Sequence, residues 1–168
     1  MTFDFFLVKW TTLYTQQKCW VMIPNFNDQG NLPEGIHDAT WQEFTQRFGY
    51  NPKRLWLLDG LLLLIQNLKA AGCEMIYIDG SFVTEKVVPG DYDMAWSINN
   101  VDPTKLDSCL LYGQPSDRSV IANKYRGDVF PAEFPEGASG KLFLDFFQTD
   151  KNTGDKKGIV AIRIGGVQ

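Results

Sequence analysis

The segments Ile78-Asp79-Gly80-Ser81 and Asp91-Tyr92-Asp93-Met94 decide how this chain folds. The apolar residues before Asp79 stop at a Gly-Ser pair, and a second apolar segment begins directly after the two later aspartates. We therefore expect strands over 74–79 and 92–98 that are joined by a loop over 80–90. Because side chains alternate along a strand, Asp91 and Asp93 project from the same face.

This arrangement of residue types suits a metal and a phosphate. Two neighbouring carboxylates repel each other, and a divalent cation removes that conflict. Sites made only of carboxylate oxygens suit Mg²⁺, with Mn²⁺ as an alternative. Gly80 and Ser81 begin a short helical turn whose free backbone N–H groups suit a phosphate, and Lys86 adds a positive charge in the same loop. The stretch therefore indicates phosphoryl or nucleotidyl transfer.

Asp145 is the candidate for a third acid. It lies within Leu142 to Phe147, an apolar run that we predict to be a buried strand, forming an antiparallel hairpin over 142–164 with a last strand at 158–164. If this strand lies beside the Asp91 and Asp93 strand, three carboxylates converge on one metal site. In the alternative interpretation, Asp91 and Asp93 sit in a turn and Asp145 faces solvent.

The other elements follow from caps and periodicity. Residues 1–23 are rich in aromatic and β-branched side chains and predict a strand-rich N-terminal extension, either an edge strand pair or a subunit contact. We expect a single domain over 24–168, with loops at 24–39 and 127–141. Helices are predicted at 41–48, from Asn51-Pro52 to Ala70, at 102–112 and at 117–126.

Composition bounds the class of protein. The 168 residues are 44% hydrophobic and 21% charged, with a net charge of −4, which is ordinary for a globular domain and argues against a broad nucleic-acid surface. The three cysteines, Cys19, Cys73 and Cys109, have no zinc or disulfide spacing. No apolar run reaches the roughly 18 residues of a membrane span. We therefore expect a cytoplasmic protein.

With these motifs in place, the chain resembles the nucleotidyltransferase superfamily related to DNA polymerase beta. More closely, it is similar to an uncharacterised, largely bacterial family of stand-alone nucleotidyltransferase-like proteins. The resemblance rests on five stretches: Asn31 to His37, Thr40 to Phe48, Asp79 to Lys86, Pro89 to Asp93 and Lys157 to Ile159. It implies an α/β (α+β) fold, a mixed β-sheet flanked by helices. It also implies that Gly80 and Ser81 hold the phosphates of a nucleoside triphosphate, while Asp91, Asp93 and Asp145 hold Mg²⁺.

Two classes of function compete at this point. The first is a Mg²⁺-dependent nucleotidyltransferase that moves a nucleoside monophosphate onto a hydroxyl of a protein, an RNA or a small molecule. The second is a non-catalytic, antitoxin-like binding subunit of a toxin–antitoxin or defence pair, acting through a protein partner and assembling into oligomers through its N-terminal segment. A phosphohydrolase using the same metal pocket is a third interpretation.

Overall fold

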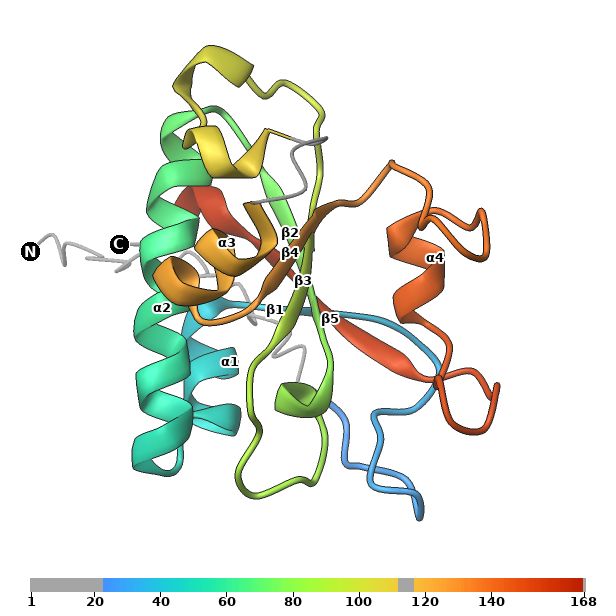
Figure 1. Ribbon diagram of the computed structural model, residues 1–168. Helices are drawn as coiled ribbons and strands as arrows, with labels where there is room; N and C mark the ends of the chain where they lie inside the picture. Colours follow the sequence, from blue (N-terminus) through green and yellow to red (C-terminus); the bar gives the residue numbers. More distant parts are fainter. Residues whose placement is uncertain (1–22, 112–116, 168) are drawn as a thin grey trace, which may run out of the picture.

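A five-stranded mixed sheet forms the centre of the computed structural model, which describes residues 23–111 and 117–167 (Figure 1). Its strands are β1 (Gly35–Ala39), β2 (Met75–Asp79), β3 (Asp93–Trp96), β4 (Asp128–Pro131) and β5 (Gly158–Arg163). Their order across the sheet is β1-β5-β2-β3-β4. The β1–β5 and β3–β4 pairs are parallel, whereas β2 pairs antiparallel with both β5 and β3. The strand-rich extension predicted for residues 1–23 lies outside the described residues, apart from Ile23.

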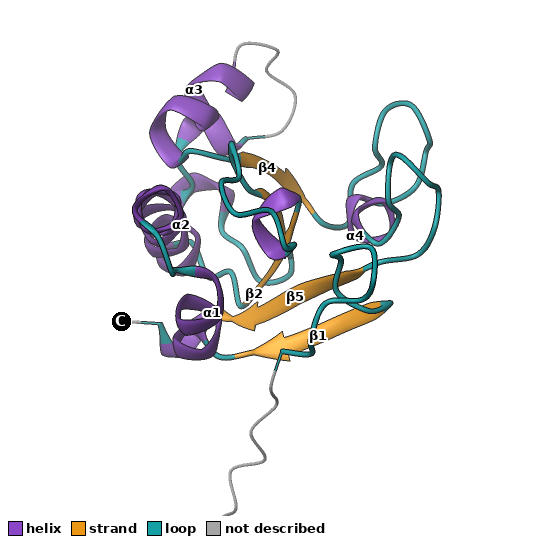
Figure 2. Ribbon diagram, turned by 90° about the horizontal axis from the view of Figure 1, so that it is seen from below, coloured by secondary structure: helices purple, strands orange, loops and turns teal. Residues whose placement is uncertain are grey.

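Three helices cover one face of this sheet and a fourth lies against the other (Figures 1 and 2). The covering helices are α1 (Trp41–Phe48), α2 (Pro52–Ala70) and α3 (Asp117–Tyr125), and the fourth is the short helix α4 (Phe143–Phe147). The predicted starts of α1 and α2 are confirmed. The Thr40 side chain accepts from the Glu43 N–H in a capping box, and the Asn51 side chain accepts from the Arg54 N–H.

Each face of the sheet has its own apolar core. The larger core packs α1, α2 and α3 against strand side chains such as Ile78, Met94 and Val160. The smaller core packs Phe143 and Phe147 of α4 against the opposite face, where Ala95 and Ile159 are buried. Because side chains alternate along each strand, residues next to these anchors can be assigned to a face. Asp93, two residues before Ala95, therefore lies on the α4 side.

Gly60 in the middle of α2 allows close packing of α3. A Cβ at this position would overlap the Tyr125 backbone carbonyl. This close approach gives a reason for a glycine inside a helix, where glycine costs about 1 kcal/mol relative to alanine.

Several predictions of secondary structure were wrong. The predicted loops 24–39 and 127–141 contain β1 and β4, two short strands at the sheet edges. The described part of the predicted helix 102–112 holds only two 3-10 turns, Pro103–Lys105 and Ser108–Leu110. Edge strands of four or five residues carry little periodic signal, and their pairing depends on partners distant in the sequence.

The predicted strand 142–147 was also wrong, and with it the hairpin 142–164. These residues form α4, and β5 pairs with β1 and β2. Only an isolated antiparallel bridge, Thr149 to Lys156, joins the two arms. The run Leu-Phe-Leu-Asp-Phe-Phe is apolar at both helical and strand spacings, so periodicity could not choose between them. Burial of Phe143 and Phe147, four residues apart, matches the helical spacing.

Candidate functional site

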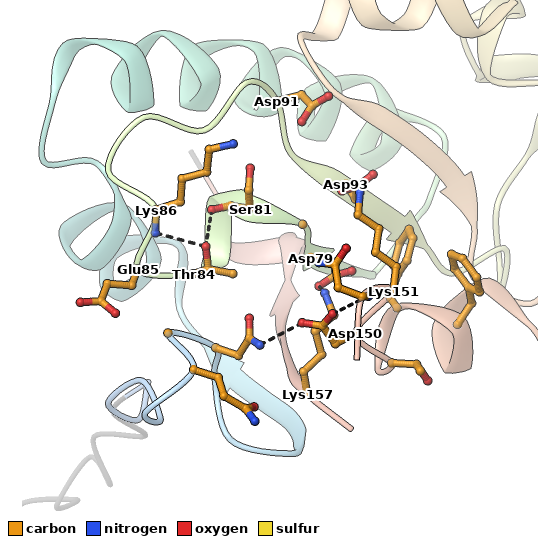
Figure 3. A pocket seen from close by; sticks show the side chains of 18 of the residues that line it. Asp79, Ser81, Thr84, Glu85, Lys86, Asp91, Asp93, Asp150, Lys151 and Lys157 are labelled. Carbon is orange, nitrogen blue, oxygen red and sulfur yellow. Dashed lines mark hydrogen bonds and ion pairs between the residues drawn. The ribbon is translucent and has the colours of Figure 1, made fainter. Parts of the chain in front are cut away.

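A cleft of about 830 Å³ opens where β2 and β3 meet the loop after β2 and the segment around α4. Five of the predicted site residues line it, namely Gly80, Ser81, Lys86, Asp91 and Asp93. Figure 3 shows Lys86 and Ser81 on one side of the view and Asp79, Asp93 and Lys151 on the other. The structure therefore brings the two halves of the sequence motif to one cavity.

The turn at Gly80 and Ser81 is shaped by close approach to Asp93. Gly80 has a φ of +78°, a conformation that L side chains rarely adopt. A Cβ on Gly80 would overlap the Asp93 carboxylate oxygen Oδ2. After it, Ser81–Val83 forms a single 3-10 turn, and the Thr84 hydroxyl donates to the Ser81 carbonyl at 2.9 Å. Only glycine at position 80 lets β2 end this close to the β3 carboxylate.

The loop that follows is held by Arg54, a residue of α2 that is fully buried. Its Nη1 donates to the Phe82 carbonyl at 2.7 Å, and its Nη2 donates to the Lys86 carbonyl at 2.6 Å. Further bonds reach the carbonyls of Phe48, Thr84 and Val87. A rigid fork of five N–H donors suits such a set of carbonyls. The sequence placed Arg54 among the polar residues outside the apolar stripe of α2, and nothing local signals its role.

Three carboxylates stand side by side on adjacent strands, and we call Asp79, Asp93 and Asp128 the carboxylate row. Asp79 is paired in register with Asp93, and Asp93 with Asp128. Neighbouring strands are about 4.8 Å apart. Asp79 shares its face with Tyr77, and Asp128 shares its face with Phe130, and both aromatic rings pack in the α4-side core. The row therefore crosses the sheet at one level on the α4 side.

The outer members of the carboxylate row have cationic partners. Lys157 Nζ lies 2.5 Å from Asp79 Oδ1, and the side chains of both residues are largely buried. Arg118 Nη2 lies 2.6 Å from Asp128 Oδ2, and its Nε donates to Oδ1 at 3.3 Å. Both ends of the row are thus neutralised by groups of the chain itself.

The central member, Asp93, makes no ion pair with any residue of the described ranges. Burial raises the pKa of Asp93 to about 6, and the charges of Asp79, Asp91 and Asp128 add to the rise. Burial also raises the pKa of Asp79, which the charge of Lys157 opposes. The charge of Lys157 also opposes the rise in the pKa of Asp93, without pairing directly with Asp93. Asp93 is thus the member of the row without an ion pair among the described residues, and Asp91, two residues away, is exposed at the cleft.

Asp145 does not join the carboxylate row. It lies on α4 with an exposed side chain and does not line the cleft, whereas β3 has β2 and β4 as its neighbours. Asp128 of β4 occupies the place beside Asp93 that the sequence assigned to Asp145. The sequence does contain a weak indication of the strand that carries Asp128, because Asp128 precedes the apolar pair Val129-Phe130 just after a predicted helix. A Gly and two Pro residues nearby favoured a loop instead.

Two other site residues were missed. Asp79 was part of the quoted motif without a role, and Lys157 belonged only to a matching stretch of the resemblance. Tyr92, by contrast, faces away from the acids as predicted: it is fully buried and donates to the Tyr125 carbonyl at 2.6 Å.

The side-chain oxygens of Asp91 and Asp93 are of the type that Mg²⁺ prefers. The set is not assembled around an ion. Within residues 23–111 and 117–167, no three His, Cys, Asp or Glu side chains are gathered closely enough to hold a metal.

The fold and cleft define a mixed α+β domain with a cleft lined by both carboxylates and lysines, and comparison with known proteins gives its family. Residues 24–163 match the model of a family of unknown function (DUF6932), and the chain belongs to that family. No curated protein and no solved structure matches the chain. Among the helices of the described residues, none combines the length and apolar character needed to cross a membrane.

Proposed function

We propose that the protein is a Mg²⁺-dependent nucleotidyltransferase that uses the cleft between β2, β3 and α4. The observation that carries the proposal is the partly buried carboxylate of Asp93, which has no ion pair among the described residues and lies between Asp79 and Asp128, beside the Gly80-Ser81 turn. A partly buried carboxylate without an ion pair lowers the free energy of unfolding. Binding of a cation during function would explain why the protein has this carboxylate.

Asp91 and Asp93 would hold the ion, and Asp128, on the strand beside Asp93, takes the place that the sequence assigned to Asp145. A bound Mg²⁺ ion supplies charge neutralisation for the phosphates of the nucleotide. Asp128 is held by Arg118, whose side chain is 73% exposed whereas that of Asp128 is only 17% exposed, so a cation that recruited Asp128 would have to replace the charge of Arg118 beside a largely buried carboxylate.

Gly80 and Ser81 line the cleft next to these acids, and because the Gly80 N–H donates to the Asp79 carboxylate, the donors left for a phosphate oxygen are those of Ser81. Lys86 adds a positive charge to the same lining. The reaction is an in-line displacement. A hydroxyl oxygen of the acceptor forms a bond to the α-phosphorus, the bond from that phosphorus to the bridging oxygen breaks, and pyrophosphate leaves. The acceptor is a protein, an RNA or a small molecule.

The test measures nucleotide binding and transfer together. Wild type should bind each nucleoside triphosphate more tightly with Mg²⁺ than with EDTA, and Asp91→Asn and Asp93→Asn should lose that difference. Asp145→Asn is the matched control, because its carboxylate is exposed outside the cleft. Labelled triphosphate, Mg²⁺ and cell lysate should yield label on protein or RNA with the wild type and with Asp145→Asn, but not with Asp91→Asn or Asp93→Asn. Equal binding by wild type and both cleft variants would contradict the site assignment.

A second candidate, the antitoxin-like binding subunit, has one observation in its favour. Asp79 and Asp128 are already neutralised by Lys157 and Arg118, which is the pattern expected of a domain that keeps its shape without a metal. It predicts that a protein partner co-purifies equally with wild type and with Asp93→Asn. Loss of the partner in that variant would count against it.

A further inference from the structure

One part of the cleft lining comes from the segment around α4, and we call it the α4 wall. Lys141, Phe146 and Lys151 line it, together with the paired Lys157. Neither Lys141 nor Lys151 makes an ion pair with a residue that the structure describes. Lys151 stands on the same side of the view as Asp93 in Figure 3. Two lysines without an ion pair among the described residues thus line the same cleft as Asp91 and Asp93.

Phe146 is an aromatic ring exposed to the same cavity. Its neighbours Phe143 and Phe147 are buried against the sheet, whereas Phe146 is 37% exposed. The ring is supported from behind, since its centroid lies 6.5 Å from that of Phe143, in an edge-on arrangement, and 6.3 Å from that of Phe147. A ring held in this way loses little conformational freedom when a flat ligand stacks on it.

We propose that this α4 wall binds the nucleoside triphosphate itself, with the base stacked on Phe146 and the polyphosphate held by Lys141 and Lys151. The inference rests on the proposed function for the identity of the ligand. It adds the residues that contact the base and the phosphates. A cleft of about 830 Å³ has the size of a small-molecule site and accommodates a nucleotide. Lysines act as point charges toward phosphates, and stacking tolerates any base, so the wall confers affinity for triphosphates more than choice among bases.

The experiment compares ATP with inorganic tripolyphosphate by titration calorimetry in Mg²⁺. Phe146→Ala should weaken ATP binding by about fivefold to a hundredfold, the range for losing one stacked base, and leave tripolyphosphate binding unchanged. Phe146→Trp should bind ATP as well as wild type does. The double variant Lys141→Ala with Lys151→Ala should weaken both ligands. Leu142→Ala, an exposed apolar residue beside α4 that does not line the cleft, should weaken neither.

Other outcomes overturn the inference. It fails if Phe146→Ala affects both ligands equally or neither, if the double lysine variant binds tripolyphosphate normally, or if wild type binds neither ligand. Its failure is separable from that of the proposed function. If ATP binding depends on Phe146 but no acceptor is labelled, the proposed transferase function is wrong and the proposed role of the α4 wall is supported. If transfer occurs equally in wild type and Phe146→Ala, the role of the α4 wall is wrong and the transferase function is supported.

Discussion

Replacement of Asp93 by asparagine tests whether the carboxylate row destabilises the protein when no cation is bound. The pKa of Asp93 is raised from 3.8 to about 6, mainly by burial. A rise of this size corresponds to about 3 kcal/mol of unfolding free energy once the group is ionised in both states. Asparagine keeps the shape without the charge, and Asp93 makes no described ion pair that the amide would lose. In EDTA at pH 7, Asp93→Asn should therefore be more stable than wild type by about 1 to 3 kcal/mol.

The pH dependence has a definite sign. Below about pH 4 the carboxyl is protonated in the folded and the unfolded chain, so wild type and variant should be equally stable apart from small packing effects. Between pH 4 and 6 the unfolded chain releases this proton before the folded one does. Wild type should therefore lose stability relative to Asp93→Asn as the pH rises through this window. Urea unfolding followed by tryptophan fluorescence at pH 4, 5, 6 and 7.5 measures the difference.

Mg²⁺ should reverse the advantage of the variant. A ligand that binds only the folded protein stabilises it, so wild type should gain more unfolding free energy from Mg²⁺ than Asp93→Asn gains. Asp145→Asn is the control, because an exposed carboxylate should change stability by no more than about 0.5 kcal/mol in either condition. The reasoning is refuted if Asp93→Asn is less stable than wild type in EDTA at pH 7, or if Mg²⁺ stabilises both equally.

Three further substitutions test how the cleft is supported. Lys157→Met should lower the free energy of unfolding by about 3 to 5 kcal/mol, because it leaves the buried Asp79 carboxylate unpaired. The double variant with Asp79→Leu should regain most of that stability, as measured by urea denaturation. Arg54→Met should cost at least about 3 kcal/mol, since five carbonyls lose a charged donor, with faster hydrogen exchange in the loop after β2; normal exchange there would contradict this role. Gly80→Ala should cost about 1 to 3 kcal/mol and abolish nucleotide binding, whereas Gly90→Ala, where a Cβ meets nothing within 4 Å, should do neither.

The sequence alone was sufficient for features that depend on neighbours within a few residues. The capping box at Thr40, the cap at Asn51 and the glycine turn after Asp79 are each made by residues within four positions of one another. The alternation that points Tyr92 into the core and Asp93 to the opposite side is equally local, and Asp91, just before β3, lines the same cleft as Asp93. These signals located α1, α2, β2 and β3, and they placed two acids beside Gly80.

The tertiary structure decided which distant residues join those two acids. Asp128 reaches Asp93 only because β4 pairs in parallel with β3, and Asp145 is carried away because its segment buries Phe143 and Phe147 as a helix. Lys157 meets Asp79 across 78 residues of sequence. Which strands pair, and which cation lies beside a buried acid, depend on how whole faces of the sheet are buried. The free energy of that burial is a sum over contacts between residues far apart in the chain, so no short motif predicts it.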